Sequence, residues 1–155
     1  MASKQSAVKA SAERDVFAHF AMQLGEQELW LSIESKDPPH PDLVCVHREL
    51  GPIAFELVAI TDPLIASINA GSSKHTGYSF WTSDPTERII RKKLDRKYET
   101  THPIELLIYS DMLVITHDES IIETTVNWLG SKDHPFRRAW FMGEFKTIPI
   151  WQNDA

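Results

Sequence analysis

Two apolar runs joined by a short link constrain the fold of this chain more than any other feature. The runs are Leu43–Val46 and Ile53–Ile60, and the link 47–52 contains a glycine and a proline. Two β-forming segments with such a link predict a hairpin. Apolar residues follow one another with little alternation, which is typical of strands covered on both faces. We therefore expect this hairpin at the centre of a sheet with helices on its two sides.

The segments around the hairpin alternate between helix and strand patterns. Residues 7–24 carry apolar side chains at helical spacing, and Gly25 predicts the end of that helix. Asp84 and Pro85 form a helix start signal for 84–98. The other expected elements are a short helix near 64–69, a helix over 119–129 that ends at Gly130, and strands over 29–33, 104–109, 136–145 and 148–151. A strand, a helix and a strand in succession indicate a crossover between parallel neighbours, so the order predicts an α/β fold with a mixed central sheet flanked by helices.

The composition is that of a single globular domain spanning residues 1–155. Apolar residues make up 42% of the chain and charged residues 25%. No apolar stretch approaches the roughly 18 residues of a transmembrane helix, and the first residues lack the apolar segment of a secretory signal. The one cysteine, Cys45, lies within an apolar run, so we expect a buried structural thiol in a reducing compartment. These observations predict a cytoplasmic protein with no membrane partner.

A glutamate, Glu56, interrupts the second apolar run. A buried carboxylate without a partner costs several kcal/mol, so it requires a cation, a metal ion or a proton. A second acid, Asp42, begins the first run directly after Pro41. The start of the first strand of a hairpin lies beside the end of the second, so we expect both acids at the same end of the sheet. Two neighbouring carboxylates repel each other, and a divalent cation relieves that repulsion.

Each acid also has a purely structural interpretation. Glu56 can pair with an arginine or a lysine, or lie on an exposed sheet edge, and Asp42 can belong to a proline-containing turn. The seven histidines do not offer a better metal site, because no two have the spacing of a zinc motif and one cysteine cannot supply a cluster. The pair of acids is therefore a more specific signal than either acid alone.

The sequence Pro41-Asp42, an apolar strand, a turn and then Glu56 in a second apolar strand resembles the PD-(D/E)XK phosphodiesterase superfamily, which includes restriction-type endonucleases. The expected order of helix, three strands, crossover helix and strand over residues 7–110 is similar to the core of that fold. The resemblance implies a restriction-endonuclease-like fold and a nuclease in which Asp42 and Glu56 bind Mg²⁺ or Mn²⁺. It also implies an acidic metal ligand on the first helix, for which Glu13 is the match, with Glu34 and Asp37 as substitutes.

The chain departs from that motif at one position. The motif has a lysine two residues after the glutamate, where this chain has Val58. Some members of the superfamily carry the lysine on the following helix instead. We expect Lys93 and Lys97 to supply this catalytic cation, because at helical spacing they fall on or beside the face that contains Leu94. The alternative is a solvated cationic face whose long side chains lie along the helix.

The charge distribution is compatible with two classes of function. The net charge of −6 disfavours non-specific nucleic-acid binding, yet six of the 16 basic residues fall within 88–97. We predict a nuclease that meets nucleic acid through this segment, with the aromatic residues of 78–81 as candidates for base stacking. The alternative is a catalytically inactive nuclease-fold module that acts in protein interaction or assembly. A possible homodimer seam is formed by four late apolar residues, Trp140, Phe141, Ile150 and Trp151.

Overall fold

A computed structural model describes residues 4–61, 85–110 and 117–153, with side chains from residue 7 onward. The helices in these ranges are α1 (Lys4–Gln23), α3 (Thr86–Asp95) and α4 (Asp118–Ser131). The strands are β1 (Trp30–Ser35), β2 (Leu43–His47), β3 (Gly51–Ile60), β4 (Ile104–Ser110), β5 (Phe136–Met142) and β6 (Thr147–Gln152). The expected helix near 64–69, the aromatic residues of 78–81 and the cap Asp84 lie outside the described residues.

The strands form one mixed sheet in the order β1-β2-β3-β4-β5-β6. The pairs β1–β2, β2–β3 and β5–β6 are antiparallel, whereas β3–β4 and β4–β5 are parallel. Helices α3 and α4 lie in the two connections between parallel neighbours, as a crossover requires. The structure thus confirms the central hairpin, the parallel pair and the α/β class with a mixed sheet.

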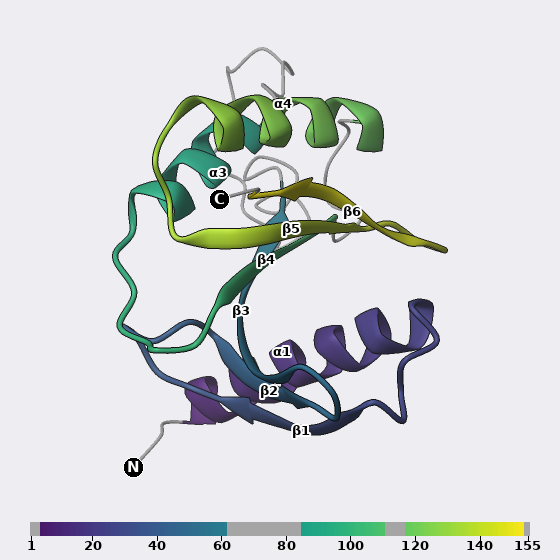
Figure 1. Cartoon of the computed structure of the whole chain (residues 1–155). Coiled ribbons are helices and arrows are strands. Elements are labelled where there is room, and N and C mark those ends of the chain that lie inside the picture. The colour runs from purple at the N-terminus through teal and green to yellow at the C-terminus, as the bar shows by residue number, and fades with distance from the viewer. Residues whose placement is uncertain (1–3, 62–84, 111–116, 154–155) are drawn as a thin grey trace, which may run out of the picture.

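Helices cover both faces of the sheet (Figure 1). On one face, α1 contributes Phe17 and Phe20 to an apolar cluster that includes Phe55 of β3. On the other face, α3 and α4 pack on a second cluster, to which they contribute Ile90, Leu94, Ile121 and Leu129. Adjacent residues of β3 therefore point into different clusters, and both clusters are apolar. This explains why the strand shows no alternation of apolar and polar residues.

Several expected boundaries are wrong, and the end of α3 bears most directly on the candidate site. This helix ends at Asp95 rather than Tyr98, because Arg96 adopts an extended conformation and the backbone N–H of Glu99 bonds to the carbonyl of Pro39 instead. Gly25 does follow the end of α1 and has a φ of 70°, a left-handed conformation that glycine adopts without strain. Gly130, in contrast, lies within α4. Strand β1 begins at Trp30, and the late strands are separated by residues 143–146.

One of the four residues expected at a dimer seam is buried within this chain, and the other three are partly buried. Phe141 is 3% exposed within the cluster beneath α3 and α4, and Trp140 packs against Phe20 of α1. Ile150 and Trp151 are partly buried against the same cluster as Phe141. The homodimer seam therefore stays a prediction.

Two further properties concern the thiol and the membrane. Cys45 is completely buried, as expected for a structural thiol, and burial raises its pKa. None of the helices in the described ranges has both the length and the apolar character that crossing a bilayer requires.

Candidate active site

The candidate site lies where β3 extends beyond the end of its neighbour β2. The pairing of β2 with β3 ends at Leu43 and Phe55, whereas β3 continues to pair with β4 as far as Ile60. Within the described part of the chain, the later half of β3 therefore has a strand on one side only. The N–H of Leu57 points to this open side, where it donates to Asp42. The carbonyl of Leu57 points to the open side as well, because the N–H and C=O of one strand residue point the same way.

At this open edge, two hydrogen bonds join Asp42 to Glu56 and to the next residue, Leu57. Asp42 and Glu56 lie one step beyond the last paired residues, so the register places them opposite each other and on the same face. The N–H of Asp42 donates to Oε1 of Glu56 at 3.0 Å, and the N–H of Leu57 donates to Oδ2 of Asp42 at 2.9 Å. The Asp42 carboxylate thus takes the place of the carbonyl that another strand residue would have supplied.

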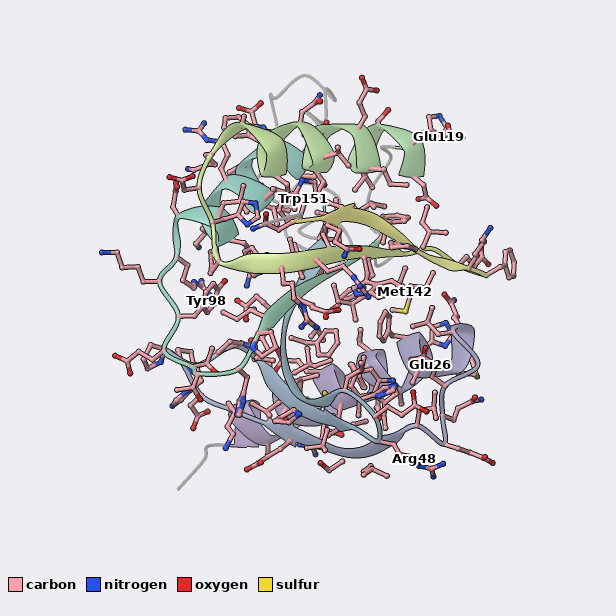
Figure 2. All side chains as sticks on the ribbon, viewed as in Figure 1. Glu26, Arg48, Tyr98, Glu119, Met142 and Trp151 are labelled. Atoms are coloured by element: carbon pink, nitrogen blue, oxygen red, sulfur yellow. The ribbon has the colours of Figure 1, made fainter. Side chains whose placement is uncertain are left out.

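The other oxygen of Glu56 accepts three hydrogen bonds. Its Oε2 lies 3.0 Å from Nζ of Lys93, 3.3 Å from Nη1 of Arg96 and 2.9 Å from the hydroxyl of Tyr98. Tyr98, labelled in Figure 2, comes from the extended segment between α3 and β4, and its ring packs on Phe136. Glu56 itself is only 1% exposed, so its charge is compensated almost entirely by the protein.

A cavity of about 350 Å³ opens beside the two acids. Four elements and two adjoining segments form its wall: α1, the later half of β3, Tyr109 of β4, the end of α3 with the following Arg96, and the loop before β2. Asp42 faces this cavity directly, whereas Glu56 lies behind it and is not part of its wall. The lining residues with ionisable side chains are Lys9, Glu13, His40, Asp42, Lys93, Arg96 and Tyr109. The cavity therefore combines acidic oxygens with several cations.

Burial raises the pKa of both acids above their ordinary values. For Asp42 the carboxylate of Glu13 adds to this increase, while the hydrogen bond from Leu57 opposes it. For Glu56 the repulsion from Asp42 adds to the increase, while the charge of Lys93 opposes it. Each carboxyl group influences the protonation of the other, so the pair titrates as a unit. The two carboxylates therefore repel each other, and a cation bound between them would relieve that repulsion.

The raised pKa values predict that Asp42 destabilises the fold at neutral pH. Its ordinary pKa is 3.8, so below about that pH both folded and unfolded chains are protonated and the folded state pays no penalty. Stability is then lost as the pH rises through the higher pKa of the folded state. We expect Asp42→Asn to raise the melting temperature by about 2–4 °C at pH 7 in the absence of divalent cations, which corresponds to about 1 kcal/mol for a chain of this size.

Thermal melts of the wild type and the variant from pH 4 to pH 8 would measure this effect. The difference between them should shrink toward pH 4. The exposed acid of the same loop provides the control, since Asp37→Asn should leave the melting temperature unchanged. A stabilisation by Asp42→Asn that is equally large at pH 4 would contradict the assignment.

The structure brings together most of the residues that the sequence singled out. Asp42, Glu56 and Lys93 form one connected group, and Glu13 lines the same cavity from α1. Lys97 does not join them, because α3 ends before it and its side chain is exposed.

The two suggested substitutes for Glu13 do not reach the cavity. Glu34 forms an exposed ion pair with Lys36, and Asp37 is exposed in the loop. In the described ranges no three acidic, histidine or cysteine side chains gather closely enough to form a preformed metal centre.

Sequence reasoning missed Arg96 and Tyr98 as partners of Glu56. Both were assigned to a helix, and a continued helix would have given Arg96 a different direction. The helical spacing of Ile90, Leu94 and Tyr98 fits a continued helix, so no local signal marked its end at Asp95. A second buried acid was also missed. Glu105 interrupts the apolar run of β4 in the same way that Glu56 interrupts that of β3, and it is 3% exposed.

Comparisons with models of protein families, with curated proteins and with solved structures found no match to this chain.

Proposed function

We propose that this chain is a divalent-cation-dependent phosphodiesterase that cleaves nucleic acid at the cavity beside Asp42. The observation that carries the proposal is the position of Lys93, whose ammonium group lies 3.0 Å from Glu56 at the edge where Asp42 faces the cavity. Members of the PD-(D/E)XK superfamily, which this chain resembles, have a lysine at this place. The motif position that normally supplies it, two residues after Glu56, holds Val58. The sequence of α1, three antiparallel strands, α3 and a parallel β4 also supports the proposal.

The donor atoms at the site fit Mg²⁺ or Mn²⁺. Magnesium is usually held by one or two carboxylates together with water and substrate phosphate rather than by a complete protein cage. Asp42 uses one oxygen for Leu57, and Oε1 of Glu56 accepts a single N–H, so each acid retains acceptor capacity on the side of the pair. The carbonyl of Leu57 lies at the same edge. Glu13 lines the cavity and would act through a bound water molecule or by its charge.

Each residue of the site would have its own role in the reaction. A bound divalent cation would lower the pKa of a coordinated water molecule and neutralise charge on the phosphate. Asp42 and Glu56 would hold that cation. Lys93, which is 18% exposed, would stabilise the negative charge that develops on the phosphate oxygens. Tyr98 would position Glu56, because its hydroxyl donates a hydrogen bond to Oε2 at 2.9 Å.

A cleavage assay tests the proposal. Purified protein is incubated with single-stranded and double-stranded DNA and RNA, with Mg²⁺ or Mn²⁺ or with a chelator. We expect cation-dependent cleavage that falls at least about 10²- to 10³-fold in Asp42→Asn and in Glu56→Gln. Glu105→Gln is the matched control, since it alters a buried acid on the opposite face of the same sheet. Mg²⁺ should also raise the melting temperature of the wild type and leave that of Asp42→Asn unchanged.

A second candidate is a non-catalytic module that retains this fold for protein assembly. The observation that favours it is the triple donation to Oε2, since Lys93, Arg96 and Tyr98 together satisfy Glu56 without a metal ion. This candidate predicts no cleavage under any condition and no effect of Mg²⁺ on the melting temperature. The two readouts of the assay therefore separate the two functions.

A further inference from the structure

Arg96 belongs both to the cluster around Glu56 and to the wall of the cavity. Its Nη1 lies 3.3 Å from Oε2 of Glu56, while 40% of its side chain is exposed. Its backbone is held in place, because its N–H bonds to the carbonyl of Lys93 and the nearby N–H of Glu99 bonds to Pro39. The guanidinium group is therefore presented to the cavity from a fixed segment of chain.

The bond from Arg96 is the weakest of the three that reach Oε2. Lys93 and Tyr98 lie at 3.0 and 2.9 Å from this oxygen, and Lys93 is less exposed than Arg96. A carboxylate offers about four lone-pair sites on its two oxygens, so two donors already satisfy one oxygen. Glu56 would therefore remain compensated by Lys93 and Tyr98 if Arg96 moved away.

Arg96 also retains most of its hydrogen-bonding capacity. A guanidinium group has five N–H donors in a planar fork, and in the described part of the chain this side chain makes one hydrogen bond. The fork can bind two oxygens of a phosphate group at once. Its single bond to a carboxylate oxygen of Glu56 does not use this geometry. Lys9 of α1 and Lys93 of α3 line the same cavity, so three cations converge on it from two helices and the extended segment that follows α3.

We propose that Arg96 binds a phosphate group of the substrate with its guanidinium fork and thereby determines the cavity's specificity for phosphodiesters. This inference rests on the proposed function for the identity of the substrate as nucleic acid. Arg96 turns from Glu56 to a phosphate adjacent to the one that Lys93 meets, and Lys93 and Tyr98 keep Glu56 in place.

The test is the binding of a short fluorescent single-stranded DNA, measured by anisotropy in Ca²⁺ at several salt concentrations. We expect Arg96→Ala to raise Kd about 10-fold or more, and to reduce the slope of log K against log salt by about 0.7. Arg96→Lys keeps the charge but not the fork, so it should keep most of the salt slope while still weakening binding. The matched control is Arg91→Ala, because Arg91 lies on the adjoining helix α3, outside the cavity wall, where it packs over Trp128 and pairs with Glu87.

Three results would overturn this inference: wild-type protein that does not bind the DNA, an Arg96→Ala variant that binds as tightly as wild type, or an equal loss in Arg91→Ala. The melting temperature of Arg96→Ala should stay close to that of wild type, and a large decrease would show that Arg96 mainly supports Glu56. Binding that depends on Arg96 without any cleavage would refute the proposed function alone. Cleavage that is unaffected by Arg96→Ala would refute this inference alone.

Discussion

A Lys93→Met variant is expected to lose about 10²- to 10³-fold of the wild-type cleavage rate while remaining folded. The side chain ends 3.0 Å from Glu56 and faces the cavity, so its removal takes away the cation that would meet the charge of the reacting phosphate. Folding should persist because Oε2 of Glu56 keeps its hydrogen bonds from Arg96 and Tyr98. Single-turnover cleavage rates and thermal melts of wild type and variant measure the two effects separately.

Lys92→Met is the matched control for this experiment, since Lys92 is the preceding residue of α3 and its side chain is exposed. It removes the same charge from the same helix without altering the cavity wall, so its cleavage rate should equal that of wild type. A greater loss in Lys97→Met than in Lys93→Met would contradict the assignment of Lys93, because Lys97 lies beyond the helix in an exposed position.

Replacing Glu105 with alanine should destabilise the protein by about 3 kcal/mol, the lower end of the range for removing one partner of a buried ion pair. Glu105 is 3% exposed and accepts hydrogen bonds from Arg137 and, at 2.7 Å, from Nε1 of Trp140. The lower end applies because the side chain of Arg137 is 44% exposed and can return to water. Urea unfolding of the wild type and the variant gives the free energy directly.

Glu105→Gln separates the charge of this residue from its hydrogen bonds. The amide oxygen can still accept from Trp140, so we expect a loss of only about 1 kcal/mol. Cleavage should be unchanged by this conservative substitution, because Glu105 pairs in register with Phe55 and points to the face covered by α1, away from Glu56. An alanine variant as stable as wild type would show that the ion pair contributes nothing.

The two buried acids show how far a pattern in the sequence leads. Glu56 and Glu105 both interrupt an apolar strand, and both are nearly inaccessible to solvent. Glu56 lies next to a cavity, because β2 begins at Leu43 while β3 continues beyond Phe55, and Asp42 directly precedes β2. Glu105 instead forms an ion pair with Arg137. An acid in an apolar run therefore predicts a compensating partner, but it does not distinguish a site from a structural ion pair.

The partners of Glu56 illustrate the opposite limit. Helical spacing correctly placed Lys93 beside the sheet-facing side of α3, since its neighbours on that side, Ile90 and Leu94, are buried. The same spacing wrongly placed Lys97 near Glu56, and it did not indicate that Arg96 reaches this acid. The helix ends at Asp95, where Arg96 turns extended and the following segment joins the Pro38–Pro39 loop through Glu99. That end depends on contacts between segments far apart in the chain.

The sequence by itself determined the central hairpin, the helices on both faces and the opposition of Asp42 to Glu56. These features follow from interactions between near neighbours in the chain, because a short link sets the register of a hairpin and a strand alternates its faces at every residue. Only the tertiary structure decided which cations reach Glu56 and that a cavity opens beside Asp42. Those outcomes depend on where α3 ends and how α1 and α3 pack on opposite faces, and no local pattern encodes the relative placement of elements that meet only in the folded chain.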